Sequence, residues 1–251
     1  MKLHIILISF VMTMCVTSCA HKSGHNRRET PSGTNNAEMT SNNVRHGEQR
    51  NLEVSMSNNH GDENKMDGAK IFSNYNTAVF MIYTSDGYNG YQGSGFFINS
   101  DGLAVSNYHV FKGTNIGAEQ IKLANRDEAF KVTEVIHSST DEDFILFRVN
   151  ATNTNYIPIA KFKPQIGEKV YAIGSPRGLE NTFSSGEVSQ WRDKNLMQIS
   201  ALIDHGSSGG ALINEYGEVV GITSGSFADG SQANLNYAWS IDVIKPYVNC
   251  K

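Results

Sequence analysis

Short runs of β-branched and aromatic residues alternate with Gly, Asn, Asp and Pro from residue 68 to residue 251. Many short strands at regular spacing, with turn signals such as Asn99-Ser100-Asp101-Gly102 between them, are typical of a β-sandwich or β-barrel. The expected strands cover residues 78–84, 92–99, 104–106, 121–123, 129–137, 144–149, 169–173, 186–191, 197–200, 211–214, 219–224 and 236–241. Helical patterns are confined to residues 72–77, 108–111 and 242–248. The sequence therefore predicts one all-β domain with a short C-terminal helix.

A different pattern opens the chain, where Met1-Lys2-Leu3-His4 precedes an apolar run from Ile5 to Val16. A basic region followed by about a dozen apolar residues is typical of a secretory signal peptide and too short for a permanent membrane span. We expect residues 1–18 to direct export. The segment Val16-Thr17-Ser18-Cys19 resembles the bacterial lipobox, which implies lipidation of Cys19 and a lipid anchor to the membrane. Ordinary signal cleavage, which would give a soluble secreted protein, is the alternative.

Residues 20–67 are predicted to be a disordered polar tether. From His21 to Met66 the chain is mostly Asn, Ser, His, Gly, Glu, Lys and Arg, with almost no aliphatic residues and no periodicity. Such a segment buries too little apolar surface to offset the entropy lost on ordering. At about 5–6 Å × √n, it would reach roughly 40 Å from its anchor.

Composition narrows the possible partners. The formal net charge is -4 and the domain has no basic stripe, which argues against nucleic acid as a partner. Of the three cysteines, Cys15 and Cys19 lie in or at the end of the predicted signal peptide, so Cys250 has no partner for an internal disulfide. The histidines after Met66 lack HxxxH spacing and cysteine partners, and acidic Ca²⁺ loops are absent. We therefore expect no metal site and no cofactor.

The most informative turn is Gly206-Ser207-Ser208-Gly209-Gly210, which lies between two apolar runs. A serine flanked by glycines can present its Oγ outward while neighbouring N–H groups point at one spot, which is how an oxyanion hole is built. Because Gly and Ser are also ordinary turn residues, a flexible loop is the alternative. A serine nucleophile needs an adjacent base, so the assignment depends on finding a histidine and a buried acid elsewhere.

The histidine and acid candidates are His109 and Asp143. His109 follows a predicted β-hairpin, and a loop at a strand end can hold a general base; a half-buried structural histidine is the alternative. Asp143 directly precedes the apolar run of residues 144–149, and Asp141 and Glu142 are its rivals on the same loop. We favour Asp143, because a carboxylate that abuts a buried strand needs a partner to remain there.

Five collinear segments resemble those of the chymotrypsin-fold serine peptidases, most of all the bacterial Deg/HtrA branch and its trypsin-like relatives without PDZ domains. The segments are Gly93-Ser94-Gly95-Phe96-Phe97-Ile98 through Asn107-Tyr108-His109-Val110; Asp143-Phe144-Ile145-Leu146; residues 167–179 with 185–189; residues 206–214; and residues 217–223. Together they cover nearly the whole domain of residues 68–251.

The resemblance implies two packed six-stranded antiparallel β-barrels with the active site between them. It implies that Ser208 attacks the scissile carbonyl, that His109 takes and returns the proton, and that Asp143 orients the imidazole. The backbone N–H groups of Gly206 and Ser208 would form the oxyanion hole. Because the sequence leaves little room after Ser208, we expect no PDZ domain.

The resemblance also implies a substrate pocket. Leu202 would form the floor of the primary specificity pocket, with Ser224, Gly225 and Ser226 as its wall and as an edge that pairs with the substrate main chain. An apolar floor without a carboxylate favours small or medium apolar side chains at the cleaved position. One departure is Asp204-His205, which stands where the Deg branch usually has Asn-Pro; His205 could be a substrate contact, a pH-sensitive latch or a polar loop residue.

The sequence thus predicts a serine endopeptidase that hydrolyses envelope or extracellular proteins through a His-Asp-Ser triad and an acyl-enzyme intermediate. We expect it to be exported and lipid-anchored in the bacterial cell envelope, either periplasmic or at the cell surface. One alternative is a non-catalytic peptide-binding or chaperone module on the same fold. Another is a conditionally active enzyme with a collapsed resting oxyanion loop, which the Asp204-His205 pair motivates.

Overall fold

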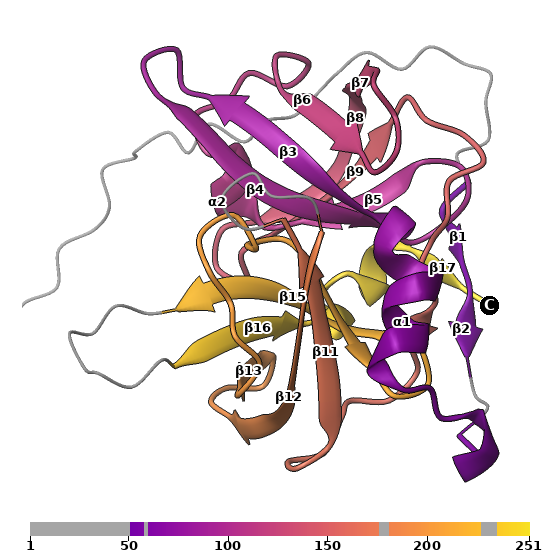
Figure 1. Ribbon diagram of the computed structural model, residues 1–251. Coiled ribbons are helices and arrows are strands. Elements are labelled where there is room, and N and C mark those ends of the chain that lie inside the picture. The colour runs from indigo at the N-terminus through magenta and orange to yellow at the C-terminus, as the bar shows by residue number, and fades with distance from the viewer. Residues whose placement is uncertain (1–50, 58–59, 176–180, 227–234) are drawn as a thin grey trace, which may run out of the picture. The chain divides into compact units, whose positions relative to one another are not determined.

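The computed structural model describes residues 51–57, 60–175, 181–226 and 235–251, which form two large, mostly antiparallel β-sheets and a small sheet of two strands (Figure 1). The predicted signal peptide, Cys19 and most of the predicted tether lie outside the described residues. All twelve predicted strands are present, and the all-β fold class is confirmed. The shared β-rich patterning of both halves explains why each folds into a sheet of its own.

The N-terminal sheet contains seven strands in the order β7-β6-β3-β4-β5-β9-β8 and is antiparallel throughout. One edge strand is β7 and the other is β8, so this half is a curled sheet rather than the closed barrel that was predicted. The strands are β3 (Val79–Ser85), β4 (Gly90–Phe97), β5 (Leu103–Ser106), β6 (Gln120–Leu123), β7 (Ala129–Phe130), β8 (Val132–Ser139) and β9 (Phe144–Val149).

The C-terminal sheet closes into a six-stranded barrel, because β14 pairs with both β11 and β15. The barrel order is β11-β12-β13-β16-β15-β14, and two short parallel strands, β10 and β2, extend it beyond β15. The strands are β2 (Met56–Ser57), β10 (Ile159–Ala160), β11 (Lys169–Gly174), β12 (Thr182–Trp191), β13 (Leu196–Ile199), β14 (Ala211–Asn214), β15 (Val219–Ser226) and β16 (Asn236–Ser240).

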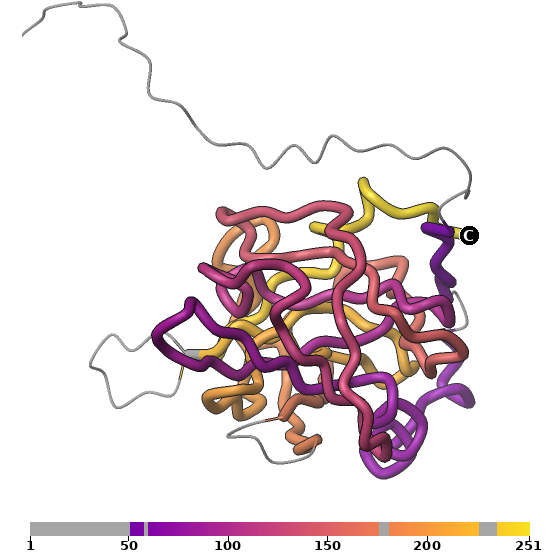
Figure 2. Tube along the Cα trace, turned by 90° about the horizontal axis from the view of Figure 1, so that it is seen from above, coloured from indigo at the N-terminus to yellow at the C-terminus, as the bar shows by residue number. Residues whose placement is uncertain are grey.

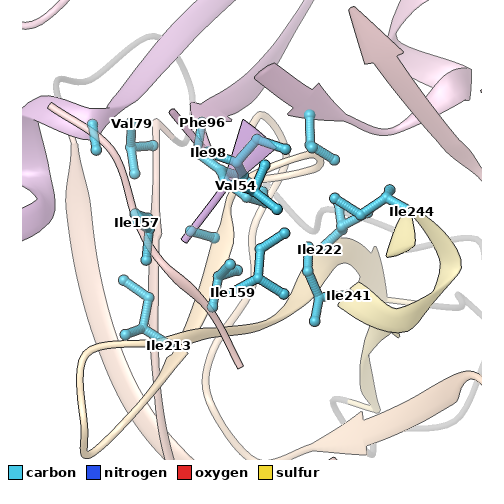
Figure 3. Close-up of a cluster of buried hydrophobic side chains, with 14 of the residues drawn as sticks. Val54, Val79, Phe96, Ile98, Ile157, Ile159, Ile213, Ile222, Ile241 and Ile244 are labelled. Carbon is cyan, nitrogen blue, oxygen red and sulfur yellow. The ribbon is translucent and has the colours of Figure 1, made fainter. Parts of the chain in front are cut away.

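Three hydrophobic clusters hold these sheets together. One cluster fills the N-terminal half and contains Phe80, Phe97 and Phe147, and another fills the C-terminal barrel around Met197 and Leu212. The third cluster draws residues from both halves and joins them (Figure 3). The alternation of side chains along a strand explains this division, since one face of β4 and β11 packs into its own half while the other face packs into the shared cluster.

The segment that precedes the domain is a correction to the sequence analysis. Residues 51–57 and 60–66 were predicted as part of the disordered tether, but β1 (Glu53–Val54) pairs in parallel with β17 (Asn249–Cys250), and β2 pairs with β10. Figure 2 shows this indigo segment beside the yellow C-terminal end. Val54 is 2% exposed and lies in the shared cluster near Ile98 and Ile159 (Figure 3). The ordered domain therefore includes residues from 51 onward.

A histidine in the same segment also contacts the C-terminal barrel. His60 Nε2 lies 3.0 Å from Oε2 of Glu218, whose side chain is fully buried, and Asn214 Nδ2 donates to the same oxygen at 2.8 Å. The His60 ring stacks on Tyr216 with centroids 4.3 Å apart. Because a buried carboxylate needs hydrogen-bond partners, these contacts stabilise the packing of residues 60–66 on the barrel.

Helices are few and short, as expected. Helix α1 (Gly68–Tyr75) begins earlier than predicted because Asp67 Oδ1 caps it by accepting from Lys70 N at 2.8 Å, and α2 (Tyr108–Phe111) carries His109. Single 3₁₀ turns form at Asp62–Asn64 and Asn76–Ala78. The predicted C-terminal helix is instead two 3₁₀ turns, Ile241–Val243 and Lys245–Tyr247, since Pro246 lacks an N–H group. Within the described ranges, none of the helices has the length and apolar character of a membrane span.

Candidate active site

Two paired strands of the N-terminal sheet bring His109 and Asp143 together. β5 runs antiparallel to β9 with Ser106 opposite Ile145, so the residues just after β5 lie beside those just before β9. His109 Nδ1 lies 2.8 Å from Asp143 Oδ2, and the His109 backbone N–H donates to Asp143 Oδ1 at 2.9 Å. The imidazole ring is therefore held through Nδ1, which leaves Nε2 available for a proton.

The turn that carries Asp143 has an unusual backbone conformation. Asp143 has a φ of 44°, in the left-handed region, which Asp adopts more readily than most residues. Its carbonyl oxygen accepts a hydrogen bond from Asn107 Nδ2 at 2.8 Å. Asp141 is exposed and contacts Thr140, whereas Glu142 accepts from Asn195. Among the described residues, Asp143 is the only acid of this loop in contact with His109.

The glycine-rich turn that precedes β14 presents Ser208 toward the other half. The Ser208 carbonyl oxygen accepts from Ser94 N of β4 at 2.8 Å, and Gly209 N donates to Thr223 O at 2.7 Å. Ser208 is partly exposed, whereas Ser207 is 8% exposed, so the two adjacent serines differ in their access to solvent. A Cβ atom placed on Gly225 would lie 3.4 Å from Ser208 Oγ, which locates that oxygen beside β15.

Two N–H groups in this turn have no protein acceptor among the described residues, those of Gly206 and Ser208. The N–H groups of their neighbours are paired: Ser207 donates to Asp204 O and Gly210 donates to Ser207 O, both at 2.9 Å. Gly206 has a φ of 95°, which favours glycine. Because buried N–H groups are nearly always paired, two unpaired groups in one turn mark a place where a negatively charged oxygen could bind.

A side chain from the C-terminal barrel completes the contacts of the acid. Ser224 Oγ donates to Asp143 Oδ2 at 2.9 Å, so this oxygen contacts both Ser224 and the His109 ring. Ser224 was predicted as a substrate-binding residue, and its side chain faces Asp143. The sequence analysis missed this bond, because nothing in the spacing of Ser224 and Asp143 indicates that β15 and the acid turn meet.

A cavity of about 510 Å³ lies next to the glycine-rich turn. Its lining includes Ser207 of the turn, Thr223 of β15, and residues of β11 and β12 such as Ile173 and Phe183. Neutral groups predominate in the lining, so the cavity can accept a small side chain; its residues are Ala172, Ile173, Gly174, Thr182, Phe183, Ser184, Leu202, Ile203, Asp204, Ser207, Thr223 and Asn236.

One expectation for this pocket is wrong. Leu202 is 68% exposed and therefore lies at the mouth of the cavity instead of forming its floor, whereas Ile203 is 9% exposed and also lines the cavity. The reason is that successive side chains of an extended segment alternate, and Ala201 and Ile203 take the buried positions. Asp204 is a charged residue in the lining.

No cluster of three or more His, Cys, Asp or Glu side chains able to hold a metal ion is found in the described part of the chain. The described residues around the glycine-rich turn supply a serine hydroxyl, an imidazole held by a carboxylate, and two backbone N–H groups without a protein acceptor.

Comparisons with known proteins show which family the chain resembles. Residues 93–222 match the family described as "Trypsin-like peptidase domain". The chain is 34% identical over 160 residues to the "Probable periplasmic serine endoprotease DegP-like" of Halomonas elongata, which covers 60% of this chain and 33% of the relative. It is 35% identical over 145 residues to "Serine endoprotease DegS" of Escherichia coli K12, which covers 54% of this chain and 40% of the relative.

A solved structure is also similar. The crystal structure of the serine endoprotease from Yersinia pestis superposes with a TM-score of 0.64 and 27% sequence identity, and covers 72% of this chain and 65% of that chain. The chain thus spans 33–40% of the length of these two curated relatives.

Proposed function

Because this chain belongs to the trypsin-like peptidase family, we propose that it is a serine endopeptidase with Ser208, His109 and Asp143 as its catalytic triad. One observation carries the proposal: Ser224 of β15 donates to Asp143, the partner of His109, and the next residue, Gly225, lies beside Ser208 Oγ. A weakly nucleophilic hydroxyl, a base oriented by a carboxylate and free N–H groups are the parts that acyl transfer requires.

The proposed reaction proceeds in two stages. Ser208 Oγ attacks the scissile carbonyl carbon while His109 takes the hydroxyl proton, and the resulting oxyanion binds the N–H groups of Gly206 and Ser208. His109 then gives that proton to the leaving amine as the C–N bond breaks, which leaves an acyl ester on Ser208. A water molecule repeats the sequence, and its attack releases the new carboxylate and restores Ser208.

Labelling with a fluorophosphonate probe tests this proposal on the purified protein. We expect the probe to phosphonylate Ser208 and the Ser208→Ala variant to remain unlabelled. Ser207→Ala is the matched control, since it removes the adjacent hydroxyl and should still be labelled. If Ser208 stays unlabelled even with peptide present, the protein is not a serine peptidase, and peptide binding without hydrolysis would indicate the chaperone-like alternative.

We propose that the enzyme cleaves after small or medium apolar residues, because Ala172, Ile173 and Ile203 line the cavity beside Ser207. The backbone of Ser224, Gly225 and Ser226 would pair with the substrate as an added strand. A peptide-library cleavage profile tests this proposal. Enrichment of Ala or Val at the cleaved position supports it, whereas a preference for Lys or Arg would overturn it and point to Asp204.

We further propose that the enzyme acts on proteins of the bacterial cell envelope. The predicted signal peptide and lipobox support this location, as does the word "periplasmic" in the name of the Halomonas relative. Metabolic labelling with an alkyne fatty acid tests the anchor. We expect wild-type protein in the membrane fraction to be labelled and a Cys19→Ala variant to be unlabelled; labelling of both would contradict lipidation at Cys19.

A further inference from the structure

Ser94 of β4 is a fully buried serine whose polar atoms all make hydrogen bonds near the site. Its Oγ donates to Gly206 O at 2.7 Å and accepts from Ser175 N at 2.9 Å. Its backbone N–H donates to Ser208 O at 2.8 Å, and its carbonyl oxygen accepts from Ser106 Oγ at 2.7 Å. Two of these four bonds go to the glycine-rich turn, one to each end of the segment 206–208.

The turn needs such bonds because glycine does not fix its own conformation. Gly206 has a φ of 95°, and a glycine reaches many other backbone conformations at little cost. The Ser94 hydroxyl holds the peptide plane that follows Gly206, and the Ser94 N–H holds the plane that follows Ser208. These two planes lie on either side of the peptide that carries the Ser208 N–H, and the first also adjoins the peptide that carries the Gly206 N–H. The Ser94 bonds therefore restrict the direction of both unpaired N–H groups through the neighbouring peptides.

The residues around Ser94 allow this close approach. A Cβ on Gly93 would lie 2.6 Å from Val110 of α2, and a Cβ on Gly95 would lie 2.5 Å from Phe80. A Cβ on Gly209 would overlap the Ser94 carbonyl oxygen and the Ser106 hydroxyl. The motif Gly93-Ser94-Gly95 thus lets one strand of the N-terminal half reach the turn of the C-terminal half with a serine hydroxyl between them.

We propose that Ser94 is a positioning residue that sets the conformation of the oxyanion turn, an inference that rests on the proposed peptidase function. Its hydroxyl does not touch the substrate and acts through Gly206. The turn that carries the nucleophile is then held by the half that carries the base, so docking of the two halves also determines whether the oxyanion hole is formed.

The test compares the Ser94→Ala variant with the wild-type protein. Loss of one oxyanion donor typically costs about 10²–10³ in kcat. Since Ser94→Ala would release the turn without removing a donor, we expect kcat to fall about 10- to 10²-fold with KM changed less than about threefold. The inhibition constant of a peptidyl trifluoromethyl ketone, which forms a tetrahedral oxyanion on Ser208, should rise in parallel with the loss of kcat/KM.

Two variants separate positioning from a general loss of packing. Thr154→Val removes another buried hydroxyl that donates to a backbone carbonyl, that of Asn99 at 3.0 Å, and this bond involves neither Ser94 nor Gly206. We expect this control to lower the melting temperature about as much as Ser94→Ala while kcat stays within about threefold. Ser94→Thr keeps the hydroxyl and should recover most of the lost kcat.

The outcomes are distinguishable. If wild-type protein is active and Ser94→Ala loses no more kcat than Thr154→Val, or loses activity without weakening the binding of the ketone, the inference about Ser94 is wrong. If wild-type protein is neither labelled nor active, the proposed function fails. A crystal structure of Ser94→Ala tests the inference without an activity measurement, and it remains informative if Ser94→Thr does not fold. A rotated Gly206 peptide in this variant supports the inference, whereas an unchanged Gly206 peptide overturns it.

Discussion

The two halves of this domain contribute to the site in different ways. In the N-terminal half the candidate site consists of side chains, since His109 and Asp143 bond to each other where β5 ends and β9 begins. In the C-terminal half it consists mainly of backbone, because a glycine-rich turn at the start of a barrel strand leaves two N–H groups unpaired around Ser208. The first contribution depends on residue identity, and the second depends on backbone conformation.

The largest expected effect comes from the side-chain half. An Asp143→Asn variant keeps the shape of the residue and tolerates the same left-handed backbone, but it no longer stabilises the charged His109 ring. We expect kcat to fall about 10⁴-fold, as is typical when the acid of such a triad becomes an amide. Asp141→Asn, on the same loop, is the control and should retain wild-type kcat. Equal losses in both variants would show that loop charge, not the bond to His109, matters.

A truncation tests whether the two halves depend on the segment that precedes them. Protein that starts at residue 68 lacks β1, β2 and Val54, which lies in the cluster shared by both halves. Burial of one such side chain contributes about 1.5–3 kcal/mol, and each strand hydrogen bond adds about 1 kcal/mol. We therefore expect the free energy of unfolding in urea to fall by about 3 kcal/mol relative to protein that starts at residue 51. Equal stability of the longer and the shorter protein would contradict a structural role for residues 51–67.

The same segment shows why some of the fold could not be predicted. The longer strands could be predicted because they contain runs of apolar residues. The predicted strands 144–149 and 211–214 have the same bounds as β9 and β14. The strands β1, β2, β10 and β17 contain two residues each, which is too short for any periodicity to appear. They form because a partner far along the chain offers a free edge, and sequence patterning carries no information about that edge.

The sequence also allowed the candidate site residues to be named, but not their contacts across the two halves. His109, Asp143 and Ser208 could be proposed because each lies at the end of a strand, in a motif typical of catalytic turns. The contacts of Ser94 and Ser224 join residues from different halves, so they depend on how the sheets pack. The position of Leu202 was misjudged because a one-residue change in alternation exchanges the buried and exposed sides of a segment.

A smaller loss of kcat is expected from removing the hydrogen bond between Ser224 of the C-terminal barrel and Asp143 of the N-terminal half. Ser224→Ala removes the hydroxyl that donates to Asp143 Oδ2, while both bonds from His109 remain. Hydrogen bonds to charged groups contribute about 1.5–3 kcal/mol, and partial exposure lowers this, so we expect kcat to fall about tenfold. Ser200→Ala is the control, since the Ser200 hydroxyl lies in the same barrel and accepts from Glu187 N at 2.9 Å; it should leave kcat unchanged. A loss of 10³-fold or more would make Ser224 an equal member of the triad rather than a support of its acid.

The smallest expected effect is on the stability of the N-terminal half and concerns Asp86. Like Asp143, this carboxylate accepts hydrogen bonds from backbone and side-chain donors, but its partners all lie in its own hairpin. Asp86, at the tip of the β3–β4 hairpin, accepts from the backbone of Asn89 at 2.7 Å, from Tyr91 OH at 2.7 Å and from the backbone of Tyr88 at 2.9 Å. These donors, that of Asn89 foremost, lower the pKa of Asp86 well below its usual value. A group whose pKa is lower in the folded state stabilises the fold above its unfolded pKa of about 4 and loses this contribution as the pH falls below that value.

The Asp86→Asn variant should therefore be slightly less stable than wild type at pH 6, and the difference between them should shrink toward pH 2.5. The effect is small because Asp86 is partly exposed and solvent screens its charge. Urea midpoints at the two pH values measure it, and Asp127→Asn, which removes a charge from another exposed turn, is the control. Since no bond of Asp86 reaches the C-terminal barrel, kcat at neutral pH should not change. A constant stability difference at both pH values would show that the hairpin does not stabilise the charged form, and altered kcat would extend the site beyond the edge where the two halves meet.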